Sequence, residues 1–438
     1  MKRLGYLCIT LLLLTCFAAL GSPASAVARS ESLTSLDEMN LGLPPGQTLK
    51  SWYEAQSGNH GNDQFFGAYV TLPVGANLYL GLGSDLPARD SGDGAYFAVY
   101  NGVNLTGIAE PNEQGLHEMI YDGAVIHIAG TDPHPDDHTA GNHYIYPPGG
   151  PFIKYRDAVY GLKNVYHTWG LWKDGSMLYV AVSAHDGSDP QQCTYGVTCM
   201  GQIYTSTSNG AVWTKKSDLG GYRAYDVIGF KYSLYAISND ALSAPLSLSK
   251  SIDGGTTWQE VAGLHETLRR VHLMVFNNRL VALSDDRSTL YALSASGQIT
   301  PYALPGGYLA GVSYPDASYT DYHIFAQAKG YLYLIAENPR LMEVAVLRTS
   351  DLLQWEEVVT SPQRLISLTY WADKDWLVAA SAGSGAKLWR VDLWGLPTVV
   401  TLSSLRASTP APLWPIATLF LLIGFINLSM QSLFVKRP

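Results

Sequence analysis

The chain has 438 residues and a formal net charge of −9, and only 15% of its residues are charged, against ~25% in average domains. No basic run occurs between its two apolar ends, which argues against a nucleic-acid-binding role. About half of the residues are hydrophobic (47%), so the chain can bury a large core.

The first 26 residues have the pattern of a secretory signal peptide. A basic start, MKR, precedes an apolar run, and the small residues Ala24–Ala26 offer a cleavage site. A lipoprotein site at Cys16 is the weaker alternative. We expect residues 1–26 to be removed on export and residues 27–49 to form an N-terminal extension.

The middle of the chain repeats a strand pattern in which a turn precedes an apolar run. Seven landmark residues recur at intervals of about 50 residues, the period typical of propeller blades: Leu78, Ile126, Leu178, Leu234, Leu280, Leu332 and Leu377. No unit contains a helical period. The sequence therefore predicts an all-β fold, a seven-bladed β-propeller of four-stranded blades over residues 50–402. An array of β-sandwiches is the alternative.

Polar residues recur in the strand that precedes each landmark. Five of them occupy nearly the same register: His117, His167, Asp226, His272 and His323. Because the first strand of a propeller blade lines the central channel, we expect these side chains to form a partial ring that could hold a metal ion or a polar ligand. The alternative is architectural: they satisfy backbone groups and channel water.

The densest polar segment is GTDPHPDDHTAGNHY, residues 130–144. Its carboxylates offer oxygen ligands for Ca²⁺, and its histidines offer nitrogen ligands for a transition metal. The candidate loop ligands are Asp132, Asp136, Asp137 and His138. A solvated connector without a ligand is the alternative.

Two cysteines remain after signal cleavage, Cys193 and Cys199. In an oxidising compartment their spacing predicts a disulfide that closes a small surface loop. A metal or redox pair is the alternative.

One turn carries a specific motif, SIDGGTTW, residues 251–258. Its Ser-x-Asp-x-Gly-x-Thr-Trp spacing resembles the Asp-box of the BNR repeat, or sialidase-like, β-propellers. Partial copies occur at residues 206–213 and 350–355. The resemblance implies a structural turn between the third and fourth strands of a blade, made by Ser251, Asp253, Gly255, Thr257 and Trp258.

The C-terminal end reads LWPIATLFLLIGFINLSMQSLFVKRP. Residues 413–435 are long and apolar enough to cross a bilayer, and Lys436 and Arg437 predict that residues 436–438 form a cytoplasmic tail. Residues 403–412 form a polar spacer. A buried C-terminal helix is the alternative to this transmembrane anchor.

Together these features predict an exported propeller that the C-terminal helix anchors to the membrane at the cell surface. We expect a binding or scaffolding module with a glycan or a cell-surface protein as ligand, no partner among nucleic acids, and Ca²⁺ or a transition metal as the candidate cofactors. Enzyme activity stays open, and no catalytic residue can be named. The resemblance also suggests the rival function, an extracellular sialidase-like hydrolase or lyase, but the arginine motif of sialidases is missing near the first unit.

Overall fold

The structure is a computed structural model that describes residues 34–58, 64–83, 94–111, 113–133, 142–156, 161–162, 164–187, 194, 197–241, 244–313 and 323–396. The described residues belong to one compact unit. The predicted signal peptide and the apolar segment 413–435 lie outside the described residues.

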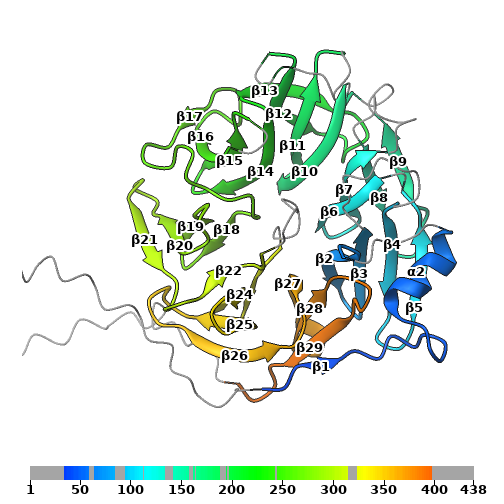
Figure 1. Cartoon of the computed structure of the whole chain (residues 1–438). Coiled ribbons are helices and arrows are strands. Elements are labelled where there is room, and N and C mark those ends of the chain that lie inside the picture. Colours follow the sequence, from blue (N-terminus) through cyan, green and yellow to red (C-terminus); the bar gives the residue numbers. More distant parts are fainter. Residues whose placement is uncertain are drawn as a thin grey trace, which may run out of the picture. The chain divides into compact units, whose positions relative to one another are not determined.

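Antiparallel β-strands arranged around a central axis make up almost the whole described fold (Figure 1). Four sheets are four-stranded. They contain β2 (Gly67–Val74), β3 (Asn77–Gly83), β4 (Tyr96–Tyr100) and β5 (Leu105–Ala109); β14 (Arg223–Phe230), β15 (Ser233–Asn239), β16 (Ser247–Ser251) and β17 (Gln259–Glu260); β18 (Met274–Phe276), β19 (Arg279–Leu283), β20 (Thr289–Leu293) and β21 (Ile299–Ala303); and β27 (Leu365–Trp371), β28 (Trp376–Ser381), β29 (Leu388–Asp392) and β1 (Asp37–Glu38).

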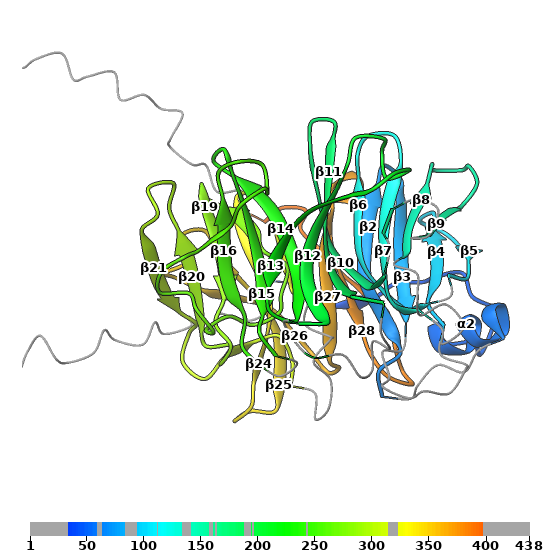
Figure 2. The same cartoon turned by 90° about the horizontal axis from the view of Figure 1, so that it is seen from above.

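Two sheets are larger. The five-stranded sheet contains β22 (Leu309–Ala310), β23 (Phe325–Ala328), β24 (Tyr331–Asn338), β25 (Glu343–Thr349) and β26 (Glu356–Ser361). The eight-stranded sheet contains β6 (Glu113–Tyr121), β7 (Ile126–Pro133), β8 (Asn142–Tyr146), β9 (Ile153–Arg156), β10 (Val165–Asp174), β11 (Met177–His185), β12 (Cys199–Ser206) and β13 (Thr214–Gly220). Figure 2 shows the strands running between the two ends of the ring.

The predicted fold class needs correction. The described strands do not form seven separate four-stranded sheets: five sheets have four or five strands, and the sixth has eight. The eight-stranded sheet arises because β10 pairs with β7 through His167 and Thr131. The Thr168 hydroxyl strengthens this junction, since it accepts from the Gly130 amide at 3.0 Å and donates to the Gly130 carbonyl at 2.8 Å.

The predicted membrane helix is likewise not part of the described fold. No helix among the described residues is both long and apolar enough to cross a bilayer. The two helical segments of the described part are α2 (Leu49–Ser57) and the short 3₁₀ helix η2 (Ala372–Lys374).

Helix α2 was not predicted. Its N-terminus has a capping box, in which the Thr48 side chain accepts from the Ser51 amide and the Ser51 side chain accepts from the Thr48 amide. Gly58 ends the helix with a left-handed φ of 73°. Trp52 and Tyr53 are buried against the first sheet, and their rings meet Tyr96 edge to face. The predicted boundary at residue 49 therefore cuts through an element that packs on the propeller.

The first part of the described chain also completes the last sheet. Strand β1 pairs antiparallel with β29, with Asp37 opposite Arg390 and Glu38 opposite Trp389. The ring is thus closed by hydrogen bonds between segments about 350 residues apart. Strand β1 covers the outer side of β29 and becomes the edge strand of this sheet.

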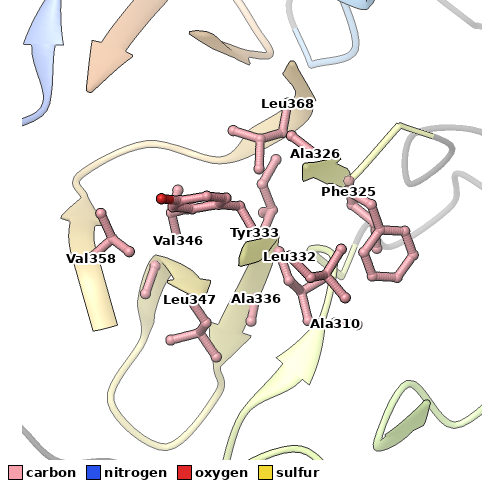
Figure 3. Packing of buried hydrophobic residues seen from close by; sticks show 14 of the residues in the cluster. Ala310, Phe325, Ala326, Leu332, Tyr333, Ala336, Val346, Leu347, Val358 and Leu368 are labelled. Carbon is pink, nitrogen blue, oxygen red and sulfur yellow. The ribbon is translucent and has the colours of Figure 1, made fainter. Parts of the chain in front are cut away.

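The core lies between neighbouring sheets, so most strands are buried on both faces. All seven landmark residues lie in the second strand of their unit and are at most 6% exposed. Figure 3 shows one cluster, where Leu332 and Tyr333 of β24 pack near Val346 and Leu347 of β25, with Leu368 of β27 close by. The apolar runs thus form continuous layers between sheets.

Gly81 of β3 lies where the sheet of β2–β5 comes very close to β6, so a larger side chain at this position should destabilise the fold. A Cβ at Gly81 would lie 2.6 Å from Cγ1 of Val70 and 2.9 Å from Cβ of Leu116. We expect Gly81→Ala to lower the free energy of unfolding by about 1–3 kcal/mol, the usual cost of overpacking. Gly306→Ala is the matched control because no atom lies within 4 Å of its Cβ position. Denaturant unfolding measures both; equal stability of the two variants would contradict the prediction.

Candidate functional site

The polar residues predicted for the channel all lie in or just before inner strands. His117 lies in β6, His167 in β10 and Asp226 in β14, while His272 and His323 immediately precede β18 and β23. Figure 1 shows that these first strands surround the axis of the ring.

A β-bulge recurs in five of these inner strands and decides which side chains share a position. In β2, β6, β10, β14 and β27 the pairing skips one residue, namely Tyr69, His117, Tyr166, Tyr225 and Ile366. The residues that follow the bulges are Val70, Glu118, His167, Asp226 and Ser367. Bulges redirect side chains locally and are common beside functional sites. The residue equivalent to Asp226 in β6 is therefore Glu118 rather than His117.

Sequence reasoning missed Glu118. The register could have identified it, because Glu118 lies eight residues before the landmark of its unit, the offset that Asp226 and His272 have from theirs. The sequence prediction named His117 instead, and His117 is the residue that the strand pairing skips at the bulge.

The structure brings Glu118, Asp226 and His272 together from three different inner segments, and we call these three residues the channel cluster. Nδ1 of His272 lies 3.2 Å from Oε2 of Glu118 and 3.3 Å from Oδ2 of Asp226. One donor atom of each residue lies within 4.8 Å of the other two. The side chains of Glu118 and Asp226 are 3% and 0% exposed, whereas that of His272 is 28% exposed.

Backbone amides fix both carboxylates. Asp226 accepts from the Val227 amide at 2.8 Å and from the Leu273 amide at 2.6 Å. Glu118 accepts through Oε1 from the Met119 amide at 3.0 Å. The second of the Asp226 bonds joins β14 to the segment that carries His272, so it also sets the position of the imidazole.

Two further histidines, His117 and His323, lie beside the channel cluster near the axis of the ring. Nε2 of His323 lies 2.6 Å from the carbonyl oxygen of His117, so this nitrogen carries the proton and donates it. The same atom lies 3.8 Å from Oε2 of Glu118, and the His272 and His323 rings are 5.4 Å apart. His117 in turn stacks on Tyr69. Two segments that are 206 residues apart in the sequence therefore meet near the axis of the ring.

Burial and neighbouring charge set the protonation of the channel cluster. Burial raises the pKa of Asp226 to about 6, although the nearby His272 opposes this shift. Burial also acts to lower the pKa of His272, but the carboxylates of Asp226 and Glu118 outweigh it and raise the pKa to about 9. Burial lowers the pKa of His323, and that of His117 well below its usual value. Two carboxylates thus face a single imidazolium.

His167 is not one of the three residues of the channel cluster. It is 1% exposed, and its ring packs against Tyr166 and Trp169 at centroid distances of 4.4 and 5.0 Å. Trp169 also receives the guanidinium of Arg270 over its face, at 5.1 Å. His167 is therefore packed among aromatic side chains.

Several predicted residues fall outside the described part of the chain. The structure does not describe Asp136, Asp137, His138 or Cys193, and the side chain of Asp132 also lies outside the described part. Cys199 begins β12, is buried and takes part in a disulfide. The pairing of Cys199 with Cys193 and the loop metal site stay predictions.

The turn 251–258 lies between β16 and β17, the third and fourth strands of their sheet. Oδ1 of Asp253 accepts from the amides of Thr256 and Thr257 at 3.0 and 2.9 Å, and Ser251 donates to the same oxygen at 2.7 Å. The Thr257 hydroxyl, which donates to Oδ2 of Asp253 at 2.6 Å, has the largest part in holding the pKa of Asp253 well below its usual value, and the bonds to Oδ1 add to it. Gly255, with φ of 86°, supplies the left-handed turn residue. Trp258 donates through Nε1 to Ser217 at 2.9 Å, which ties the turn to β13. The motif residues thus bond to one another and to β13, which is a structural role.

A second buried polar cluster connects β7, β8 and β10 away from the channel cluster. Nδ1 of His127 lies 3.2 Å from Nε2 of His143, and its Nε2 lies 3.2 Å from Oδ2 of Asp122. Lys173 pairs with the same carboxylate. Burial lowers the pKa of His127, which Asp122 only partly offsets, and lowers that of His143 further. Both imidazoles are therefore neutral in the folded protein at neutral pH.

These two histidines predict a loss of stability in mild acid. Histidines in the unfolded chain gain protons below a pKa of ~6.5, whereas buried His127 and His143 do not, so the unfolded state binds more protons as the pH falls. Asp122 stays charged over this range, because burial acts to raise the pKa of its carboxyl but hydrogen bonds from Lys173 and from two backbone amides outweigh burial and hold this pKa well below the usual value. The contribution of His127 and His143 to the free energy of unfolding should therefore fall from about pH 7 to about pH 5, whereas Asp226 and His272, whose pKa values are raised to about 6 and about 9, act in the opposite sense.

The slope of the free energy of unfolding against pH shows whether His143 causes this loss of stability. His143→Gln should make the slope shallower, because one buried imidazole is lost. His265→Gln should leave it unchanged, since His265 is 53% exposed and pairs with Glu260 at the surface. Denaturant titrations across this pH range measure the slopes. An identical slope in the wild type and His143→Gln would contradict the assignment.

Comparison with known proteins identifies the fold alone. No protein-family model matches the chain, and no curated protein matches it in sequence. Among solved structures, a puromycin hydrolase is similar with a TM-score of 0.53 and 10% identity over 81% of this chain and 55% of that one. A puromycin-hydrolyzing peptidase from Mycobacterium tuberculosis has a TM-score of 0.50 and 12% identity over 82% and 54%. The chain thus spans about half the length of these two proteins.

A virginiamycin B lyase from Staphylococcus aureus is also similar, with a TM-score of 0.47 and 11% identity over 82% of this chain and 99% of that one. The chain has the β-propeller arrangement of these neighbours. No comparison supports membership of the BNR or Asp-box family, so that resemblance rests on the turn motif. The neighbours include enzymes as well as a peptide-bound protein, YCF48, and they do not decide between catalysis and binding.

Proposed function

We propose that the protein is a ligand-binding propeller module in which the channel cluster holds a divalent transition-metal ion and presents it to a polar ligand. One observation carries the proposal: a nitrogen of His272 lies 3.2 and 3.3 Å from oxygens of two buried carboxylates. These are spacings expected between ligands of one ion. Bond lengths of about 2.1 Å in a tetrahedral site separate ligand atoms by about 3.4 Å.

The donor set supports a transition metal rather than Ca²⁺. Imidazole suits zinc and its neighbours, whereas Ca²⁺ takes six to eight oxygen ligands. Metal binding would replace the proton on Nδ1 of His272 and balance the charge of Glu118 and Asp226. Without a metal, two buried carboxylates share one imidazolium, an arrangement that leaves excess negative charge in a site of low dielectric.

The number of donors also allows for an external ligand. The channel cluster supplies three protein donors, and sites with three protein ligands keep a coordination position for water or an external ligand. His272 is the exposed member of the channel cluster. A carboxylate or hydroxyl of a glycan or peptide would suit such an open position.

The first experiment measures metal content and affinity. The full-length protein, stripped with chelator, should bind Zn²⁺ and Mn²⁺ in calorimetry, and elemental analysis of the untreated protein should show one bound ion. Asp226→Asn keeps the shape and an oxygen acceptor for Leu273 but loses a charged ligand. It should weaken affinity by more than the ~10–100-fold that loss of a second-shell partner causes.

His265→Gln is the control, because it removes an exposed histidine that has a carboxylate partner but no place in the channel cluster. It should bind metal as the wild type does. Absence of binding in the wild type, or equal binding by Asp226→Asn, would refute the metal site and leave the channel cluster as architecture.

A second candidate function is glycoside cleavage, and one observation favours it: two facing carboxylates meet in the ring, as general-acid and nucleophile pairs do. Against it, backbone amides and His272 engage both groups, and their side chains are at most 3% exposed. Release of sugars from a glycan panel by the wild type, and its loss in Glu118→Gln, would establish the enzyme. Binding of glycans without cleavage would support the module.

The location is proposed on sequence alone. The signal-like residues 1–26 and the apolar residues 413–435 support export followed by tethering to a membrane at the cell surface. The channel cluster would then face extracytoplasmic ligands. Protease added to intact cells should digest the propeller; its full protection would contradict this location.

A further inference from the structure

One end of the ring consists mainly of short strand connections, with the segment around Asn40 and Leu41 bonded beside the turn 101–104. In each antiparallel meander the turn from first to second strand and the turn from third to fourth strand lie at the same end. We call this end the hairpin face. Its turns are residues 75–76, 101–104, 122–125, 147–152, 175–176, 207–213, 231–232, 252–258, 277–278, 294–298, 329–330, 350–355 and 372–375.

Contacts between different units show that these turns share one face of the ring. Four pairs join a turn or strand end of one unit to that of another: Lys173 with Asp122, Asn277 with Ser350, Lys329 with Asp375, and Trp371 with Gly75. Turns and strand ends of neighbouring units therefore lie beside one another at this end.

The hairpin face exposes large apolar side chains at its tips. The described residues expose ten such side chains, and seven of them lie at or beside these turns or directly after β29: Val103, Tyr121, Val212, Tyr232, Ile252, Leu353 and Trp394. Tyr232, Trp394 and Ile252 are 103%, 84% and 78% exposed. They contribute little to the core, and their burial against another apolar surface would be favourable.

The distribution of these tips points to a flat partner. They belong to five of the six sheets, on different sides of the ring (Figure 1). A small ligand or an extended peptide would cover only one or two of them. Tyrosine and tryptophan, two of the three most exposed, favour the boundary between water and lipid because each has an apolar body and a polar group.

The chain leaves the described fold at this same face. The Leu393 amide donates to the Asp375 carbonyl in the turn 372–375 at 2.9 Å, and Trp394 follows at once. Residues 397–412 then span at most about 55 Å before the apolar stretch 413–435 begins. A tether this short keeps the hairpin face near whatever membrane holds that stretch.

We propose that the hairpin face rests on the surface of a lipid bilayer, with Tyr232, Ile252 and Trp394 in its interfacial layer. The proposal rests on the membrane tether proposed above. Apolar insertion rather than charge drives the contact, because the face carries both signs: Lys231 adjoins Tyr232, while Asp253 and Asp351 cap their own turns. A zwitterionic bilayer is therefore sufficient.

This orientation would also leave the channel cluster accessible. His272 and His323 precede inner strands that end at the hairpin face, so they lie toward the other end of the ring. With the hairpin face on lipid, the opposite end would point to the aqueous phase, where a soluble or cell-surface ligand could reach His272.

The test uses the full-length protein in phosphatidylcholine vesicles and hydroxyl-radical footprinting. Tyr232 and Trp394 should be oxidised several-fold more slowly than in the vesicle-free protein. Met342 is the internal control, because it is 93% exposed in the turn between β24 and β25 at the opposite end. It should be oxidised equally with and without vesicles.

A double variant separates docking from tethering. Tyr232→Ser with Ile252→Ser should restore the oxidation of Trp394 while the protein still floats with the vesicles. Val197→Ser with Leu341→Ser, which changes two exposed residues away from the hairpin face, should leave Trp394 protected.

Each alternative has its own outcome. Failure of the wild type to float would refute the tether, and with it the proposal. Flotation with Tyr232 and Trp394 as reactive as Met342 would refute docking alone. Protection that appears only at high protein density, or without lipid, would identify a second copy of the chain as the partner and overturn the bilayer contact.

Discussion

The bulge in the inner strands is the constraint on which the ring centre depends. An antiparallel strand alternates its side chains between two faces, so an inner strand buried on both faces presents few residues to the axis. Skipping one residue at Tyr69, His117, Tyr166, Tyr225 and Ile366 changes this alternation in five strands. Glu118 and Asp226 meet because the bulge places them identically in β6 and β14, and both accept the amide of the residue that follows.

The two ends of the ring have different physical characters because they are built from different connections. At the hairpin face the connections are short, and their tips carry exposed apolar side chains. Toward the other end lie the starts of the inner strands and the buried charges of the channel cluster. A rigid body held together by interlocking sheets can thus present a lipid-compatible end and a polar end, and it needs no hinge between them.

Buried polar groups in this fold have two distinct roles. Asp122, His127 and His143 satisfy one another between strands, as a packed polar network does when every member has a partner. The channel cluster differs because its charges do not balance: two carboxylates share one imidazole nitrogen, and that imidazole is the partly exposed member. This imbalance, together with the ligand-like spacing, distinguishes a candidate site from architecture.

The sequence by itself determined that the fold is an all-β propeller and that the polar residues lie in or beside inner strands, but its prediction of seven separate four-stranded blades was wrong. A period of about 50 residues and apolar runs are local properties, so the landmarks were found in the second strands where they were expected. The motif at 251–258 likewise closes its own turn by bonds between near neighbours. Local chemistry is legible in a sequence because the groups that interact are close along the chain.

Only the tertiary structure decided how the units join and which residues meet. The pairing of β10 with β7, which makes one eight-stranded sheet, depends on single contacts of His167 and Thr168 with residues about 37 positions earlier. The channel cluster joins residues from three inner segments, and its choice of Glu118 over His117 depends on one bulge. Helix α2 was missed because its short amphipathic pattern is ordinary until Trp52 and Tyr53 find the first sheet. A shift of one residue turns a side chain to the other face of a strand, and a single sequence does not show where that shift occurs.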